Sequence, residues 1–355
     1  MKKLHYFCFG VDIGGTNTKI SLFEINSSSK KLNSDFYIDY KSHFFDIKLI
    51  DSVIIKTQKN FRDENTINSS KDFINNLYNS FDNLISKNKI EKNQLFAYSF
   101  ATPGFPDNNL KKVIGGAFNI HFLDKIEFSD FVSNYDNNYF YLNLVNDVTS
   151  QGYYEQVIKQ DKFKNKDDIA VLIALGTGIG GAIFTKEKIL LGQNGWAAEF
   201  GHLPLWFKKS DDKITKCTCG KINCIEAFAS VRAYIDMLKE KGFNISAEQS
   251  LEKYFSGKAE QSLIDVTNFW LETLATLTST LIYIFNPSII IIGGSVSKIE
   301  KFTNLIYTRT KEYVNPILME DVKFFTSSDA ILAGTYGAVI HGITTMYDKI
   351  INRLK

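Results

Sequence analysis

The sequence predicts a two-domain α/β fold, and three observations support this. Segments with the pattern of β-strands alternate with segments of helical spacing, which is characteristic of α/β proteins. The 355 residues are enough for two hydrophobic cores. The stretches DIGGTNTKI, from Asp12, and ALGTGIGGA, from Ala174, repeat the order strand, glycine turn, strand. We predict a first α/β domain over residues 1–145, completed by the C-terminal helix, and a second over residues 146–335.

The first domain is expected to open with a β-hairpin over residues 4–25, in which an apolar strand to Ile13 enters the tight turn GGTN. Residues 41–69 are rich in Asn, Ser and Lys, so we predict a polar, loop-bearing insertion there. Apolar residues at helical spacing indicate a helix from Lys71. Two strands follow, QLFAYSFATPG and YFYLNLVND, and the polar tip of the second precedes a helix from Thr149.

The second domain is expected to begin with the strand and turn of DIAVLIALGTGIGGAIF. A long apolar helix over about 262–285 ends at Asn286 and Pro287 and leads into the strand SIIIIGG. The C-terminal segment from about Ser328 has helical spacing. Strands and helices thus alternate in this half as well.

Composition excludes several classes of protein. With 44% hydrophobic and 23% charged residues and a net charge of +2, the chain has no general attraction to nucleic acid or to an anionic membrane. The apolar run after the two N-terminal lysines is short and reads as a strand, not as a signal peptide. The longest later apolar stretch is broken by Asn286 and Pro287, short of the ~18 residues of a membrane helix. We expect a cytoplasmic protein with neither nucleic acid nor membrane as a partner.

The glycine turns are the first candidate binding residues. Glycine lets backbone N–H groups approach phosphate oxygens, and consecutive amides form an anion-binding nest. Each hairpin alone also fits an ordinary turn, whereas two in one chain favour a polyphosphate held between two domains. Neither matches a Walker loop or a dinucleotide fingerprint. A third glycine pair ends the strand SIIIIGG, before a helix that begins near Ser297. The candidate phosphate-binding residues are Asp12, Gly14, Gly15, Thr16, Asn17, Lys19, Gly176, Thr177, Gly178, Gly180, Gly293 and Gly294, with Asp12 placed to hold a hydrated Mg²⁺.

Asp147 is the candidate catalytic residue. It ends an apolar strand in NLVND, where a carboxylate can take the proton of an attacking alcohol, an effect of roughly 10²–10⁴ in rate. Asp and Asn also favour the N-cap of a helix. The motif alone supports both interpretations equally.

Three of the four cysteines lie in CTCGKINCIEAF, which begins at Cys217. In a reducing compartment such clusters indicate metal or redox chemistry rather than structural disulfides. Cys8 lies in the first predicted strand and is expected to be buried. Glu199 and His202 precede the cluster in AAEFGHLPL. A lone His is more often structural, but this one completes a one-His, three-Cys set typical of tetrahedral zinc. The predicted ligands are His202, Cys217, Cys219 and Cys224; a redox pair or free thiols are the alternatives.

Taken together, these segments resemble the ROK family of sugar kinases and regulators, in the actin/hexokinase-like ATPase superfamily. The resemblance covers most of the chain and rests on VDIGGTNTKISLF, SFATPGFPD, NLVNDVTSQGYYE, ALGTGIGGAIF, EFGH, CTCGKINCIE and IIIIGGSVS, in family order. It implies a two-domain actin-like ATPase (ribonuclease H-like) fold with a nucleotide and sugar cleft between the domains. The combination of EFGH with the cysteine segment is the part specific to ROK proteins.

The resemblance also implies roles. It makes Asp147 the base that deprotonates the sugar hydroxyl. It also implies that the glycine hairpins bind the phosphates of ATP together with Mg²⁺. His202 would bind zinc with one ring nitrogen and face the sugar with the other. The implied sugar contacts are Asn146, Asp147, Glu199, His202 and Glu226.

The implied activity is that of an ATP-dependent hexose kinase, with glucose converted to glucose 6-phosphate as the first expectation. Fructose, mannose, allose and N-acetylmannosamine are alternative substrates. A sugar-sensing regulator is the rival, but the first hairpin begins at residue 12 and leaves no room for a preceding helix-turn-helix. A non-catalytic actin-like protein is the third possibility, and a homodimer is expected from the family.

Three features depart from the family pattern. Asn223 stands where the family has a glycine, and if φ is positive there, Asn is among the least costly replacements. The loop between His202 and Cys217 is longer than usual, which costs little free energy. The third departure is the insertion over residues 41–69.

Overall fold

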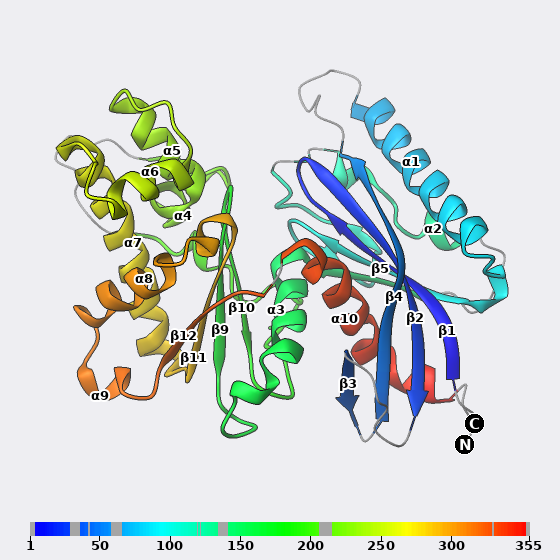
Figure 1. Cartoon of the computed structure of the whole chain (residues 1–355). Coiled ribbons are helices and arrows are strands. Elements are labelled where there is room, and N and C mark those ends of the chain that lie inside the picture. Colours follow the sequence, from blue (N-terminus) through cyan, green and yellow to red (C-terminus); the bar gives the residue numbers. More distant parts are fainter. Residues whose placement is uncertain are drawn as a thin grey trace. The chain divides into compact units, whose positions relative to one another are not determined.

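The computed structural model describes residues 4–28, 36–41, 43–57, 66–118, 120, 122–133, 141–205, 215–328 and 330–352. The chain forms two compact units (Figure 1). Unit 1 comprises Met1–Ile158, Leu191–Trp196 and Ile331–Lys355, and unit 2 comprises Lys159–Leu190 and Ala197–Ala330. The sequence predicted a boundary near residue 145; in the structure helix α3, Asp147–Ile158, still belongs to unit 1.

Unit 1 is built on a six-stranded sheet in the order β3-β4-β2-β1-β5-β8. Strand β1 is antiparallel to β2 and parallel to β5, and β5 is parallel to β8. The β1–β2 pair is the hairpin predicted for residues 4–25. The strands are β1 Leu4–Ile13, β2 Asn17–Ser28, β3 Tyr37–Tyr40, β4 His43–Lys56, β5 Leu95–Thr102 and β8 Tyr141–Asn146, with a separate ribbon of β6 Pro106–Asp107 and β7 Lys112–Val113.

Two helices cover the two faces of this sheet (Figure 1). Because side chains alternate along a strand, Phe9 and Gly10 of β1 point to opposite faces. Phe9 packs against Phe81 of α1, Thr66–Lys87, with ring centroids 4.6 Å apart. On the other face, a Cβ at Gly10 would lie 2.3 Å from the carbonyl oxygen of Thr335, so the glycine admits α10, Ala330–Asn352, close to the sheet. Helix α2, Asp130–Ser133, completes the unit.

Residues 43–56 correct one prediction. They form β4, paired with β2 over its whole length, instead of a loop-bearing insertion. Within the strand Phe45 and Ile47 are buried while Lys48 is exposed. The Asn residues of the predicted insertion, at positions 60, 65 and 68, all follow the strand. Composition averaged over residues 41–69 therefore hid an apolar strand in the first half of that range. Residues 58–65 of the predicted insertion lie outside the described residues.

The outer edge of β8 is covered by two polar side chains from the loop around β6 and β7. Asn108 binds both backbone groups of Leu144: its Oδ1 accepts from the N–H at 2.8 Å and its Nδ2 donates to the carbonyl at 2.7 Å. The Lys111 ammonium donates to the carbonyl of Leu142 at 2.8 Å. Backbone groups that an edge strand would leave unpaired are therefore satisfied within unit 1.

Unit 2 repeats the hairpin arrangement on a four-stranded sheet in the order β10-β9-β11-β12. Strand β9 is antiparallel to β10 and parallel to β11, and β11 is parallel to β12. The regular helix predicted from near Ser297 begins later, because Ser295–Lys298 form a 3₁₀ turn. The elements are β9 Ala170–Leu175, β10 Ile179–Phe184, α4 Glu226–Ala229, α5 Val231–Glu240, α6 Ala247–Phe255, α7 Gln261–Phe285, β11 Ile289–Gly293, α8 Phe302–Lys311, α9 Pro316–Met319 and β12 Lys323–Thr326.

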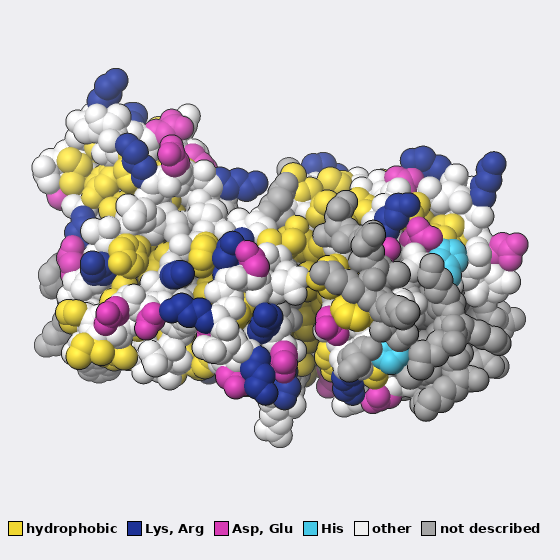
Figure 2. Space-filling view, turned by 60° about the horizontal axis from the view of Figure 1, so that its bottom comes forward, with side chains coloured by type: hydrophobic (Ala, Val, Ile, Leu, Met, Phe, Trp, Pro, Cys, Tyr) yellow, Lys and Arg dark blue, Asp and Glu magenta, His cyan; other side chains and the backbone are white. Residues whose placement is uncertain are grey.

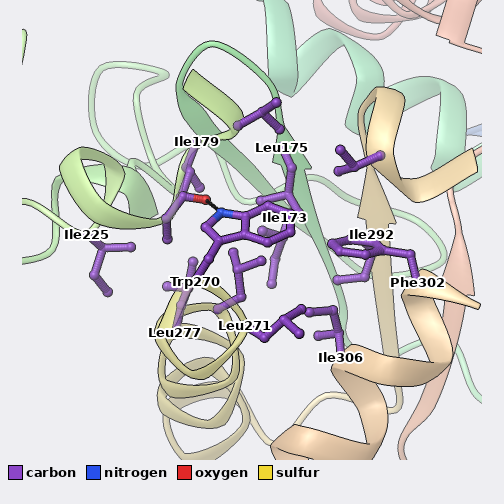
Figure 3. Packing of buried hydrophobic residues seen from close by; sticks show 14 of the residues in the cluster. Ile173, Leu175, Ile179, Ile225, Trp270, Leu271, Leu277, Ile292, Phe302 and Ile306 are labelled. Carbon is purple, nitrogen blue, oxygen red and sulfur yellow. Dashed lines mark hydrogen bonds between the residues drawn. The ribbon is translucent and has the colours of Figure 1, made fainter. Parts of the chain in front are cut away.

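The core of unit 2 is organised around Trp270 of α7, the long apolar helix predicted from the sequence. Its ring stacks on Tyr234 with centroids 4.3 Å apart. Phe302 lies on the side of β11, with ring centroids 5.5 Å apart (Figure 3). The indole N–H donates to the carbonyl of Ala229 at 2.8 Å. A buried indole needs such a partner. The helix ends at Asn286, whose φ of 43° is a left-handed cap.

The surface matches the near-neutral composition. On the face shown in Figure 2, Lys and Arg side chains are interspersed with Asp and Glu. Among the described residues, no helix combines the length and the apolar character needed to cross a membrane.

We expect Trp270→Phe to lower the free energy of unfolding by about 2 kcal/mol, because the substitution leaves a void and a buried carbonyl without its donor. Ile284→Ala, on the same helix but 60% exposed, is the control and should change it by less than about 0.5 kcal/mol. Urea unfolding followed by circular dichroism measures both. Equal losses would contradict the proposed packing role of Trp270.

Candidate functional site

In unit 1, parallel pairing brings three sequence-predicted site residues to one edge of the sheet. Asp12 near the end of β1 is in register with Ala101 of β5, and Thr102 of β5 is in register with Asn146 at the end of β8. Asp147 follows Asn146 directly. Ligands of open α/β sheets bind at the carboxyl ends of such strands.

The turn of the first hairpin is tight and supported from both sides. The N–H of Gly14 donates to the carbonyl of Asn17 at 3.1 Å, and Thr57 donates its N–H to the carbonyl of Thr16 at 3.1 Å. Across the hairpin, the Lys19 ammonium lies 3.2 Å from the Asp12 carboxylate. Gly15 and Thr16, at the tip, are exposed.

Asn146, and not Asp147, caps helix α3. The Asn146 Oδ1 accepts from the N–H groups of Val148 and Thr149 at 3.0 and 3.1 Å, and its Nδ2 donates to the carbonyl of Gly104 at 3.1 Å. Helix α3 is therefore capped without Asp147, and the N-cap interpretation does not explain this residue. The Asp147 carboxylate accepts from the N–H of Val148 at 3.0 Å and from its own backbone N–H.

The electrostatics of unit 1 mark Asp147 as unusual. Burial, together with the nearby negative charge of Asp12, raises the pKa of Asp147 to about 6. The carboxyl group of an unperturbed Asp titrates near pH 4. A carboxylate with a pKa this close to neutrality is suited to accept and release a proton.

Helix α10 supplies residues that the sequence reasoning missed. A Cβ at Gly334 would lie 2.5 Å from Cγ of Asp12, and a Cβ at Gly337 would lie 1.7 Å from the carbonyl oxygen of Ser150. The Ser150 hydroxyl donates to the carbonyl of Gly334 at 2.7 Å. These glycines bring α10 against both the first hairpin and α3. The small residues in AGTYG were the available signal.

In unit 2, the second hairpin and the third glycine pair lie next to each other. Gly293 is in register with Ala174, next to the turn. A Cβ at Gly294, where φ is 98°, would lie 1.7 Å from the carbonyl oxygen of Leu175, so only glycine fits. The N–H of Val231, at the start of α5, donates to the carbonyl of Gly176 at 3.0 Å. Gly176 and Thr177 are exposed at the tip of the turn.

The EFGH segment packs directly on this hairpin. A Cβ at Gly201 would lie 2.3 Å from the carbonyl oxygen of Ile179. Ala198, just before Glu199, has a φ of 71°, which is costly for a residue with a side chain. The two ring nitrogens of His202 face different neighbours. Nε2 lies 3.8 Å from the Glu199 carboxylate, and Nδ1 lies 3.8 Å from Sγ of Cys217.

The four predicted metal ligands come together in unit 2. One ligand atom each from His202, Cys217, Cys219 and Cys224 lies within 4.8 Å of every other. Tetrahedral zinc, with Zn–S bonds of about 2.3 Å, places two sulfurs about 3.8 Å apart. The Sγ atoms of Cys219 and Cys224 are 3.7 Å apart. The donor set and its spacing therefore fit zinc.

The clustered thiols differ in their pKa values, and the pKa of Cys219 is lowered, against the effect of burial, by its hydrogen bonds. Burial and the hydrogen bond with Cys219 raise the pKa of Cys224 to about 12, and burial also raises the pKa of Cys217. Crowded, buried thiols resist deprotonation because the thiolates repel one another. A divalent cation compensates those charges and deprotonates its ligands.

The asparagine that replaces the family glycine adopts the conformation foreseen for it. Asn223 has a φ of 56°. Its N–H donates to the carbonyl of Thr215 at 2.8 Å, and its own carbonyl accepts from the N–H of Leu205 at 2.8 Å. The substitution thus leaves the loop around Cys224 intact. Residues 206–214 of the long loop lie outside the described residues.

Glu226 lies deeper than the other predicted sugar contacts. It is 8% exposed, and its Oε2 accepts from the N–H of Ile179 at 2.9 Å. Its Oε1 accepts from the hydroxyl of Thr218 at 3.1 Å. Thr218, between two predicted metal ligands, was also missed by the sequence reasoning.

We expect purified protein to contain about one equivalent of zinc, and Cys224→Ser to lose most of it, because a hydroxyl is a poor zinc ligand. Metal analysis by mass spectrometry measures this. Cys8→Ala, which removes the thiol of strand β1 in unit 1, is the control and should keep its zinc. Less than about half an equivalent in correctly folded wild-type protein would refute the zinc assignment.

Several curated proteins are similar in sequence to part of this chain. N-acetyl-D-glucosamine kinase of Haemophilus influenzae is 28% identical over 158 residues, 42% of this chain and 50% of that kinase. Glucokinase of Thermotoga maritima is 30% identical over 185 residues, 48% of this chain and 57% of that enzyme. The chain spans about half the length of the curated relatives it matches.

A likeness in fold extends over almost the whole chain. The crystal structure of a ROK family protein from Streptococcus pneumoniae in complex with sucrose superposes with a TM-score of 0.69 at 17% identity, covering 96% of this chain and 99% of that one. The predicted two-domain actin-like ATPase fold is thereby confirmed. The ROK family description matches residues 48–342. Since this match covers most of the chain, the protein belongs to the ROK family.

Proposed function

We propose that this protein is an ATP-dependent hexose kinase, which transfers the γ-phosphoryl group of ATP to a hydroxyl group of a sugar. The observation that carries the proposal is Asp147, a carboxylate with a pKa raised to about 6 at the carboxyl end of β8. It lies in the same unit as the first glycine hairpin, whose Asp12 contributes to that raised pKa. A base beside a phosphate-binding turn is the arrangement that phosphoryl transfer to an alcohol requires.

In the proposed reaction, the Asp147 carboxylate accepts the proton of the sugar hydroxyl as its oxygen attacks the γ-phosphorus. The bond from the γ-phosphorus to the oxygen bridging to the β-phosphate breaks, and ADP leaves with those electrons. Mg²⁺, when bound, neutralises charge on the phosphates. Asp12 is suited to hold its hydration shell. The exposed turn residues around Gly15 and Gly176 are suited to the phosphates, and the remaining glycine positions shape those turns.

The proposed sugar contacts differ in how much bonding capacity they retain. Asn146 has both lone pairs of Oδ1 engaged and keeps one N–H of its amide. Glu199 and the Nε2 side of His202 are partly exposed, and Glu226 keeps one lone pair on Oε2. Binding of zinc through Nδ1 would fix the tautomer of His202, which then offers Nε2 to a hydroxyl.

Glucose is the first proposed substrate, with glucose 6-phosphate as the product. N-acetylglucosamine joins it as a second candidate, since several curated relatives are N-acetyl-D-glucosamine kinases. Fructose, mannose, allose and N-acetylmannosamine complete the set.

A coupled assay of ADP release tests the proposal. With ATP and Mg²⁺, we expect turnover with at least one of these six sugars and little release without sugar. Asp147→Asn should lower turnover by about 10²-fold or more while sugar affinity stays within about threefold, because the base is lost and the shape is kept. Asp161→Asn, an exposed carboxylate beyond α3, is the control. No sugar-dependent turnover, or a fully active Asp147→Asn, would refute the proposed function.

The pH dependence follows from the same carboxylate. A base must be deprotonated to act, so kcat/KM should be constant above pH 7 and fall about tenfold per pH unit below the Asp147 pKa of about 6. ATP must saturate the enzyme at each pH, since ATP itself takes up a proton in this range. Asp161→Asn should give the same profile. A rate that stays constant down to pH 5 would contradict the assignment of the base.

A further inference from the structure

Within unit 2, Glu226 connects the predicted metal ligands to the second glycine hairpin. On one side, its Oε1 accepts from the Thr218 hydroxyl at 3.1 Å and lies 3.7 Å from Sγ of Cys217. On the other, its Oε2 accepts from the N–H of Ile179, the first residue of β10, at 2.9 Å. The two oxygens of one carboxylate thus contact the cysteine loop and the turn that follows β9.

The fit around this carboxylate is close. A Cβ at Gly178 would lie 2.4 Å from Oε2, so the hairpin approaches Glu226 through a position without a side chain. The Arg232 guanidinium is 4.0 Å from Oε1 and partly exposed. A carboxylate that is 8% exposed depends on its donors, because burial without them is costly. Loss of the Thr218 hydroxyl therefore loosens the hold of Glu226 on Ile179.

The order of the loop depends in turn on the metal ligands. Thr218 is flanked by Cys217 and Cys219, and both belong to the cluster that fits zinc. Binding of a metal by its two neighbours restricts the backbone of Thr218 and directs its hydroxyl. The connection runs from the metal ligands to Thr218, to Glu226, and to the Ile179 amide.

We propose that Glu226 is a positioning residue that couples occupancy of the metal site to the shape of the second hairpin, so that a filled site tightens binding of a nucleoside triphosphate. The identity of that ligand rests on the proposed function, whereas the coupling between the loop and the hairpin does not. The role is additional to a sugar contact, because Oε2, which accepts from the N–H of Ile179, has a second lone pair.

A second path from the ligands to the hairpin exists and must be separated from this one. His202 is next to Gly201, which packs on the carbonyl of Ile179. Variants of Thr218 leave that path and all four metal ligands intact. They also leave the Glu226 side chain in place.

The test compares Thr218→Val, which removes the hydroxyl but keeps the branched shape, with Thr218→Ser, which keeps the hydroxyl. In the full-length, metal-loaded protein we measure zinc content, hydrogen–deuterium exchange of the Ile179 amide, and the affinities for Mg–ATP and for the sugar.

For Thr218→Val we expect full zinc content, faster exchange at Ile179, Mg–ATP affinity weakened by about 3- to 10-fold, and sugar affinity within about twofold. Thr218→Ser should match the wild type. Thr308→Val, which removes an exposed hydroxyl of α8, is the matched control.

Removal of the metal from the wild type provides a second measurement without any substitution. At a chelator concentration that leaves the amides of α7 protected, exchange at Ile179 should become faster. Unchanged exchange at Ile179 in both experiments overturns the coupling, and so does a Thr218→Val variant that loses sugar and Mg–ATP affinity equally. Wild-type protein that binds neither Mg–ATP nor any sugar overturns the proposed function instead, and exchange at Ile179 still tests the coupling.

Discussion

The pairing of a glycine-turn hairpin with a neighbouring parallel strand is the constraint on which both units depend. In unit 1 the hairpin β1–β2 is joined to β5 through β1, and in unit 2 the hairpin β9–β10 is joined to β11 through β9. Parallel pairing places strand ends side by side, so each glycine turn lies at the edge where the following strand also ends. Every other proposed site residue is placed relative to one of these two edges, through α3 and α10 in unit 1 and through EFGH and the cysteine loop in unit 2.

How far the sequence predicted this arrangement depended on whether the signal was local. The hairpins, helix α7 and the four metal ligands were predicted because glycine turns, apolar periodicity and cysteine spacing can be read within a few residues. Strand β4 was missed because its composition was averaged with that of the Asn-containing residues that follow it. Gly334 was missed because the side chain that leaves no room for a Cβ there is Asp12, more than three hundred residues away in the chain. No local pattern records a contact of that kind.

The site of unit 1 carries a cost in stability. The pKa of Asp147 is raised from the ordinary value near 4 to about 6 in the folded state, so the folded chain binds this proton more tightly than the unfolded chain does. The free energy of unfolding contributed by this group therefore falls as pH rises between those two values and stays low above them. The left-handed Ala198 next to Glu199 is a comparable cost in unit 2. Both lie where chemistry is proposed.

The cover over the edge of β8 bears on how the chain is made. Asn108 and Lys111, which satisfy the backbone of Leu144 and Leu142, precede that strand in the sequence. A ribosome synthesises a chain from its N-terminus. Asn108 and Lys111 are therefore synthesised before β8. Both side chains are already present when the backbone groups that they bind leave the ribosome. An exposed edge is the part of a sheet most open to pairing with another chain, and in this protein the order of synthesis shortens the time for which that edge is bare.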